Sequence, residues 1–329
     1  MRLDRRTLLR GTLGVAVSVV AVWILLGSVD VGAALAVLGR ADLRWVAFMV
    51  LTVFIDVAAR AGRWRALLAP IAAVPYPHVL GYTYIGYLAN NVLPARLGEL
   101  VRSHALGEGE GLSRTTVLGT VVVERIVDTV IVVGLAAISV VVLSVRGTLS
   151  SAVLLGAAFV GLLLLGLAVA IALHRLPGAD RVTAYASRWP RLVELARRLR
   201  DGLAVAARPR TMAAALALSA LAWAASITSF LAAGQAVGVQ LTVSQAALMA
   251  SGVALATIVP SGPGYLGTFE LTAVGIASTF GVDRSAAFAL ALLVHAMILA
   301  GTSVGGVIAL LVRRRRPAPT MGPTVDNPA

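Results

Sequence analysis

Long apolar runs constrain this chain more than any other feature of its sequence. A membrane-spanning helix needs about 20 apolar residues to cross about 30 Å of hydrocarbon. Six segments meet this length, at residues 8–29, 43–61, 115–143, 150–173, 211–233 and 285–312. The chain is 59% hydrophobic and 13% charged, whereas soluble domains contain about 45–50% apolar and about 25% charged residues. Hydrocarbon must therefore be its outer solvent, which predicts an all-α, polytopic membrane helix bundle.

Two further apolar segments, residues 79–106 and 243–281, are each interrupted near their middle. The first is broken by NNVLPARLGE at 90–99 and the second by PSGPGYLGTFE at 260–270. The halves are about 10 to 17 residues long, which is short for a crossing. Irregular backbone at membrane depth is tolerated only where it is buried in protein or lines a wet cavity. We therefore expect two re-entrant helical hairpins beside about six full spans; the charge pattern also allows eight thin spans.

The arginines predict the orientation, because positive charge concentrates in cytoplasmic loops. With both hairpins returning to the side from which they enter, the basic segments 1–7, 174–210 and 313–329 fall on one side. Both termini are then cytoplasmic in a bacterial inner membrane. On the same side the second span ends with Arg60, Arg63 and Arg65.

The chain divides into a cytoplasmic flank (1–7), a transmembrane domain (8–312) and a basic, disordered tail (313–329). Between 174 and 210, leucines recur at helical spacing with arginines between them. This pattern indicates an amphipathic helix on the inner leaflet, or equally a solvated loop helix.

The two breaks resemble one another, since each has a proline, then Leu-Gly, then a glutamate. The topology places them on opposite faces, as an inverted repeat, and transporters build midplane sites from such discontinuous helices. Pro94 and Pro263 suit the first turn of a helix. The helix starts would then point inward and attract an anion such as phosphate. The alternative is that the prolines only kink packed helices.

Three charged residues lie inside the span 115–143, where each is costly: Glu124, Arg125 and Asp128. The two carboxylates are four residues apart on one helix face, so a cation is expected between them. Arg96 or Arg102 of the first hairpin could supply it. Two interpretations stay open and have equal weight: a polar cavity that holds a lipid phosphate, or an internal ion-pair network that locks the hairpin to the bundle.

Other polar residues in the apolar segments have simpler interpretations. Asp56 and Arg60 are spaced for a local pair at the cytoplasmic end of their span. His295 is expected to be a hydrogen-bonded packing residue rather than a relay. An aromatic belt at the interface is expected from Tyr76, Tyr82, Tyr84 and Tyr87.

Several function classes are disfavoured. The chain has no cysteine and only four scattered histidines, so neither a metal site nor a disulfide is predicted. The net charge of +13 fits anionic lipid headgroups better than nucleic acid. GPGYLG at 262–267 has the spacing GxGxxG, but no strand precedes it, so a dinucleotide site is rejected. No dedicated nucleophile is visible, and we expect neither an enzyme nor a cofactor.

Three blocks carry a resemblance to a known family: NNVLPARLGELVR at 90–102, ERIVD at 124–128 and PSGPGYLGTFE at 260–270. In this order they resemble the signature of the lysylphosphatidylglycerol synthase transmembrane family, a flippase-like membrane domain. The resemblance implies a lipid-translocating domain with paired re-entrant helices. Only residues 317–329 follow Arg316, so the aminoacyl-transferase domain of bifunctional members is expected to be absent, and synthase activity is not carried over.

The leading hypothesis is a flippase-like protein that moves an anionic or zwitterionic phospholipid, a glycolipid or a polyprenyl-phosphate-linked lipid between leaflets. The predicted substrate-binding residues are Asn90, Asn91, Arg96, Glu99, Arg102, Glu124, Arg125, Asp128, Gly264 and Glu270. Membrane lipids are the expected partners, with a homo-oligomer or a separate lipid-modifying enzyme left open. The alternatives are an ion-coupled transporter of a small polar solute, a membrane-embedded transferase with a lipid-linked donor, and a non-catalytic scaffold.

Overall fold

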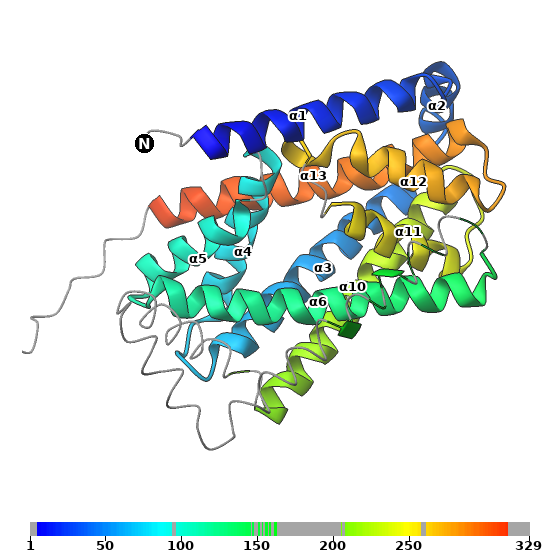
Figure 1. Ribbon diagram of the computed structural model, residues 1–329. Helices are drawn as coiled ribbons and strands as arrows, with labels where there is room; N and C mark the ends of the chain where they lie inside the picture. The colour runs from blue at the N-terminus through cyan, green and yellow to red at the C-terminus, as the bar shows by residue number, and fades with distance from the viewer. Residues whose placement is uncertain are drawn as a thin grey trace, which may run out of the picture.

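The computed structural model describes residues 5–93, 97–145, 208–257 and 261–314, and scattered positions between 147 and 205. This part of the chain is built from helices alone (Figure 1). They are α1 (Arg5–Leu26), α2 (Val31–Leu38), α3 (Leu43–Leu68), α4 (Tyr76–Val92), α5 (Gly98–Gly109), α6 (Arg114–Val142), α10 (Pro209–Ala236), α11 (Val243–Ala256), the 3-10 turn η3 (Pro263–Tyr265), α12 (Thr268–Ser278) and α13 (Arg284–Arg314). The predicted all-α class is confirmed.

Four of these helices, α3, α6, α10 and α13, are long and apolar enough to cross a membrane. The apolar part of α1 and the short α2 form a pair bent by 87°, which makes a fifth candidate if it is one span. In hydrocarbon every backbone polar group must be satisfied internally, and a helix does this within one segment. The described residues thus form a multi-pass membrane bundle. The predicted span 150–173, the amphipathic segment 174–210 and most of the tail lie outside the described residues.

The first interrupted segment folds back on itself as α4 and α5. Glu110 follows α5, and its Oε1 lies 2.8 Å from Nδ1 of His78 at the start of α4. At the break, Asn90 Oδ1 accepts a hydrogen bond of 2.7 Å from the Gly98 N–H. A Cβ on Gly98 would lie 2.1 Å from the Gly86 carbonyl oxygen, so glycine is needed for this close approach. The outer ends of the two helices therefore lie together, and so do their inner ends.

The second interrupted segment folds back as α11, η3 and α12. A Cβ on Gly252 of α11 would meet the Ile276 side chain of α12 at 2.3 Å, so the two helices run side by side. Pro263 opens the 3-10 turn, which fits proline's preference for a first turn, but the second half-helix α12 begins only at Thr268 and not at Pro263 as predicted. Gly264 and Gly267 have φ values of 64° and 84°, a left-handed conformation that glycine adopts without steric cost. These two residues reverse the chain between the half-helices.

The two hairpins lie toward opposite ends of the bundle (Figure 1). The α4–α5 pair lies near the end where α1 begins and α13 finishes, whereas α11 and α12 lie near the opposite end, beside α2. Their tips nevertheless meet, because η3 packs against α4. A Cβ on Gly264 would lie 3.7 Å from the Asn91 carbonyl oxygen.

Helix α1 covers the second break from outside. Ser18 Oγ accepts a hydrogen bond of 2.8 Å from the Gly262 N–H, which has no partner within a helix. One turn earlier, a Cβ on Gly14 would lie only 2.6 Å from the Ser261 carbonyl oxygen. Small residues on α1 therefore let its backbone touch the irregular chain and satisfy it, as hydrocarbon requires.

We expect Gly14→Ala to destabilise the protein by about 1–3 kcal/mol, because the added methyl group collides with backbone that cannot move aside cheaply. Gly134→Ala on α6 is the matched control, since nothing lies within 4 Å of its added Cβ. In an unhindered helix interior this change stabilises by about 0.5–1 kcal/mol. Unfolding in detergent, followed by circular dichroism, measures both. Equal melting temperatures for the two variants would contradict the close packing of α1 on the break.

Two details differ from the sequence predictions. The last helix continues through Arg314, so Arg313 belongs to it and not to a tail. Arg313 lies 3.6 Å from Glu108 and its guanidinium stands 5.6 Å from the Tyr82 ring centroid. Tyr82 is buried rather than part of an interfacial belt, because the α5 end and α13 close over it.

Candidate functional site

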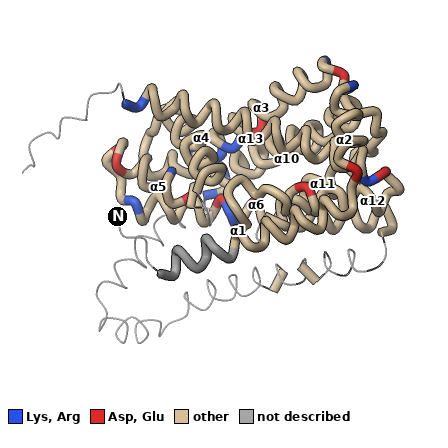
Figure 2. Tube along the Cα trace, turned by 90° about the horizontal axis from the view of Figure 1, so that it is seen from above, with Lys and Arg blue, Asp and Glu red and all other residues tan. Residues whose placement is uncertain are grey.

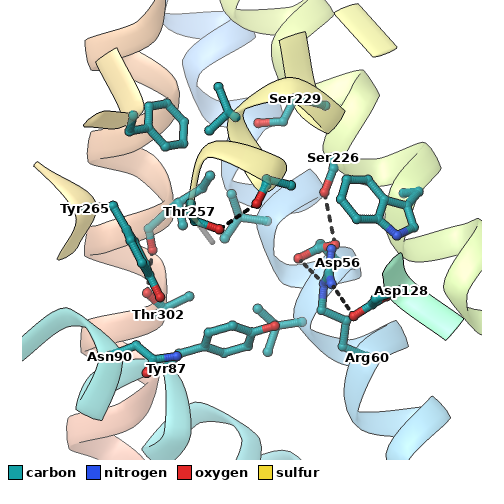
Figure 3. Close-up of a pocket in the computed structure, with 18 of the residues that line it drawn as sticks. Asp56, Arg60, Tyr87, Asn90, Asp128, Ser226, Ser229, Thr257, Tyr265 and Thr302 are labelled. Carbon is teal, nitrogen blue, oxygen red and sulfur yellow. Dashed lines mark hydrogen bonds and ion pairs between the residues drawn. The ribbon is translucent and has the colours of Figure 1, made fainter. Parts of the chain in front are cut away.

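A central cavity of about 340 Å³ lies where the two hairpin tips meet the long helices. Its walls come from α3, α4, α5, α6, α10, α11, α12, α13 and the second break. In Figure 3, Tyr87, Asn90, Tyr265 and Thr302 face it from one side, and Asp56, Arg60, Asp128 and Ser226 lie opposite. Apolar side chains such as Val53, Val253 and Leu299 fill the remaining wall. The cavity is thus amphipathic, with a charged side and an apolar side.

The charged side belongs to an ion-pair network in the interior of the bundle. Figure 2 shows charged residues among the helices beside α5 and α6, as well as at the bundle ends. The network joins arginines of three helices to carboxylates of three helices: Arg60, Arg63, Arg102 and Arg125 to Asp56, Glu99, Glu124 and Asp128. The formal charges of these eight side chains balance, which is what burial of charge requires.

Arg63 of α3 is the centre of this network. Its side chain is fully buried; it forms a two-pronged contact with Asp128 and lies 3.0 Å from Glu124. It is therefore a buried cation shared by the two α6 carboxylates. The prediction that placed Arg63 among cytoplasmic flanking charges is wrong, because α3 continues to Leu68 and carries this residue inside the bundle.

Arg102 of α5 was predicted to reach the α6 carboxylates, and it does. Its guanidinium donates to Glu124 at 2.8 Å and lies 4.5 Å from the Trp64 ring centroid. Of the two α6 carboxylates it contacts Glu124, so it ties the first hairpin to α6 without lying between the two acids. Arg96, the other predicted cation, lies outside the described residues.

Arg125 is the most exposed arginine of the network, with 40% of its side chain accessible. It lines the cavity and lies 2.5 Å from Glu124, 3.0 Å from Asp128 and 3.9 Å from Glu99. Its Nε is buried and has no hydrogen-bond partner among the described residues. A ligand in the cavity could contact the exposed part of the Arg125 side chain.

Asp56 and Arg60 form the predicted local pair, at 2.9 Å, but they do more than was predicted. Both line the cavity. Arg60 also lies 3.6 Å from Asp128 and stands 5.2 Å from the Trp223 ring centroid, while Ser226 donates to Asp56 at 3.2 Å. The pair thus belongs to the cavity wall and not to the end of a span.

The amide side chains of the first break hold its shape. Asn90 caps the start of α5, and Asn91 donates to the hydroxyls of Thr302 and Ser303 of α13, each at 2.9 Å. Both asparagines line the cavity, and so does Tyr87, which was predicted to lie in an interfacial belt. These contacts fasten the tip of the first hairpin to α13.

The second break is held by Glu270 and His295. Glu270 Oε2 accepts the Gly267 N–H at 2.8 Å, and His295 lies between Glu270 and the Gly264 carbonyl oxygen. The helix starts that were predicted to bind an anion are therefore partly occupied by the chain's own side chains. Asn90 accepts an N–H at the start of α5, and Glu270 accepts one at the start of α12. His295 is hydrogen-bonded, as predicted, and it also lines the cavity.

Most predicted site residues come together, and the residues that were missed lie on α3, α10 and α13. The cavity or its network includes Asn90, Asn91, Glu99, Arg102, Glu124, Arg125 and Asp128. Gly264 and Glu270 are not among the cavity-lining residues, but both contact His295, which lines the cavity. A signal for α3 existed, because Asp56, Arg60 and Arg63 repeat at i, i+4 and i+7, which places them on one helix face.

The chain matches the family described as "Lysylphosphatidylglycerol synthase TM region" over residues 11–306. It belongs to this family. The resemblance of the three sequence blocks is therefore confirmed. The lysylphosphatidylglycerol synthase TM region includes both hairpins and every cavity-lining residue that the structure describes. A search of the curated proteins finds no match.

Proposed function

We propose that this membrane domain moves a lipid with a phosphate-bearing headgroup between the two leaflets, and that the central cavity receives the headgroup on the way. One observation carries the proposal: the broken tips of both hairpins and a charged network of three helices enclose one amphipathic cavity. Membership of the lysylphosphatidylglycerol synthase TM family supports a role with lipids. The proposed role is transport, and it assigns no bond-making step to the cavity residues.

The size of the cavity suits a headgroup. Its volume of about 340 Å³ is at the lower end of the range of about 300–1,000 Å³ for small-molecule sites. A glycerophosphate headgroup fits this space, whereas two acyl chains do not. The chains would remain in hydrocarbon outside the bundle while the headgroup passes through the protein.

The charges of the cavity would lower the main barrier to lipid movement, which is the loss of headgroup hydration. A single charged side chain at the bilayer centre costs about 2.5–3.5 kcal/mol on insertion scales. Arg125 lines the cavity with 40% of its side chain exposed, and guanidinium binds phosphate oxygens with charge-assisted hydrogen bonds. Hydroxyls of Ser226, Thr257 and Tyr265 line the same space. Together these groups replace part of the lost water.

The arrangement of the hairpins supports access from both sides. We take α4–α5 and α11–α12 as re-entrant hairpins that enter from opposite faces, the first from the cytoplasm, with both termini cytoplasmic. Their positions toward opposite ends of the bundle agree with this inverted arrangement (Figure 1). Broken half-helices that meet near the midplane are how many transporters build such sites. Movement of one tip at a time would open the cavity to one leaflet and then to the other.

The test is a leaflet-resolved assay in proteoliposomes with a cavity-filling variant. Ala254→Trp places an indole in the cavity wall, and we expect it to slow lipid movement at least tenfold. Ala224→Trp is the matched control, because Ala224 lies on the exposed face of α10 and its indole would point into lipid. Labelled phosphatidylglycerol, phosphatidylethanolamine and a polyprenyl phosphate are compared. If no labelled lipid moves faster than in protein-free vesicles, the proposal is wrong.

A second candidate is an ion-coupled transporter of a small polar solute, which the modest volume of the cavity also favours. The same vesicles distinguish the two. Uptake of a solute driven by a proton or sodium gradient, with no change in lipid movement, would favour this candidate.

A further inference from the structure

A buried histidine and a buried glutamate join the second break to the last long helix. His295 and Glu270 are each only 3% exposed. His295 Nδ1 lies 2.5 Å from Glu270 Oε1, and its Nε2 lies 2.7 Å from the Gly264 carbonyl oxygen. The Phe269 ring stacks on the imidazole at a centroid distance of 4.2 Å. The imidazole is therefore held on both edges and on one face.

The two hydrogen bonds of the imidazole define its proton count. A carbonyl oxygen only accepts, so Nε2 must carry a hydrogen to bond Gly264. An ionised carboxylate also only accepts, so Nδ1 must carry a hydrogen as well. The hydrogen bond from the Gly267 N–H to its second oxygen and the helix dipole in the first turn of α12 both favour the ionised form of Glu270. His295 is therefore an imidazolium, and the pair holds one proton more than a neutral ring beside a carboxylate.

This proton joins three pieces of the fold. Glu270 belongs to α12, His295 to α13, and Gly264 to the left-handed turn between the half-helices. If the proton leaves, the neutral ring keeps one N–H and can satisfy only one of its two acceptors. The other nitrogen lone pair would then face an oxygen lone pair across a buried contact, which is costly. The turn next to Gly264 includes Tyr265, which lines the cavity.

We propose that Glu270 and His295 form a proton-binding site, and that its proton holds the second break closed against the cavity. Release of the proton to water in the cavity breaks only an N–H bond and leaves a neutral imidazole. The contact to Gly264 or to Glu270 is then lost, and the break loosens. The inference rests on the proposed function, to which it adds the energy source: a proton gradient would bias which state of the second hairpin is populated.

The other charged or titratable groups around the pair lie on a few elements. The described side chains of α1, α2 and α11 that could pack against it are uncharged. Across the cavity stand the Asp56–Arg60 pair of α3, the hydroxyl of Tyr87 of α4, and the charged cavity residues of α5 and α6, which are Glu99, Arg102, Arg125 and Asp128. On the pair's own side the remaining titratable neighbour is Tyr265, and tyrosine ionises only near pH 10. His295 and Glu270 are thus the titratable pair on this side of the cavity.

Nitrogen NMR of the imidazole tests the proton directly. The variant with His78→Gln, His104→Gln and His174→Gln leaves His295 as the single histidine and can be labelled at its ring nitrogens. We expect both nitrogens to be protonated at about pH 5 and one to lose its proton as the pH rises through about pH 8. In the same variant carrying Glu270→Gln, the ring is expected to be neutral already at the lower pH. A ring whose charge is the same across this range would overturn the proposal.

Thiol labelling tests the loosening. The chain has no cysteine, so Thr257→Cys, beside the second break in the cavity wall, is a single reporter for a water-soluble maleimide. We expect its modification rate to rise roughly tenfold across the same pH range, and to lose this pH dependence when His295→Gln is added. Thr129 of α6 also lines the cavity, and Thr129→Cys is the control. The modification rates at both positions are corrected for thiol ionisation. Equal pH profiles for the two positions would count against the proposal.

Neither measurement requires lipid movement, so the two proposals can fail separately. A pH-dependent reporter in a protein that moves no lipid would leave the proton site intact and remove the lipid function. Lipid movement with an invariant imidazole charge would support the lipid function and remove the proton site.

Discussion

Arg63→Met should lower the free energy of unfolding by about 3–5 kcal/mol, the usual cost of removing one partner from a buried ion pair. Arg63 is fully buried and contacts both Glu124 and Asp128. Without it, these two carboxylates lose their buried shared cation in a low-dielectric interior, and Arg125 is the remaining cation that contacts both. Methionine fills a similar volume but supplies no charge. We expect a much reduced yield of monodisperse protein and a lower melting temperature in detergent.

A matched variant separates this effect from the general loss of an arginine. Arg44 lies on the same helix but is exposed, so Arg44→Met should change stability by well under 1 kcal/mol. Adding Asp128→Asn to Arg63→Met should recover part of the loss, because one unpaired carboxylate is then removed. If Arg63→Met is as stable as Arg44→Met, the network does not hold the bundle together.

Arg125→Gln should reduce lipid movement at least tenfold while the protein stays folded. Glu124 keeps Arg63 and Arg102 as partners, and Asp128 keeps Arg60 and Arg63. Glu99 loses its 3.9 Å contact with Arg125, but its side chain is 22% exposed and can be hydrated. The change instead removes the exposed guanidinium that we propose meets phosphate. A charge-assisted hydrogen bond is worth about 1.5–3 kcal/mol, and each 1.4 kcal/mol is a factor of ten. The leaflet-resolved assay measures the rate.

Two controls make this result interpretable. Arg284→Gln removes an exposed arginine away from the cavity and should leave the rate unchanged. Arg125→Lys keeps the charge as a compact ammonium without the planar fork that binds phosphate in two places, so an intermediate rate is expected. A full rate for Arg125→Gln would remove Arg125 from the transport path and favour the interpretation of the network as purely structural.

The two interpretations of the charged span are not exclusive in this structure. Arg63 and Arg102 are buried against their carboxylates and have a structural role. Arg60, Arg102 and Arg125 of the same network also line the cavity. A binding site assembled on a charge-balanced network has the advantage that its exposed arginines are already oriented before a phosphate arrives.

The sequence by itself determined the membrane class, the helical content, the two breaks and the presence of charge on α6. Each of these follows from local chemistry: hydrocarbon requires apolar runs of a certain length, proline removes a donor, and a charge within such a run needs a partner. The partners themselves were decided by the tertiary structure. Whether Arg63, Arg96 or Arg102 separates Glu124 from Asp128 depends on how α3 and α5 are rotated about their axes and packed on α6. The link from His295 to Gly264 likewise depends on where α13 crosses the second break. Such contacts join residues far apart in the chain, and no local pattern records the rotation of one helix against another.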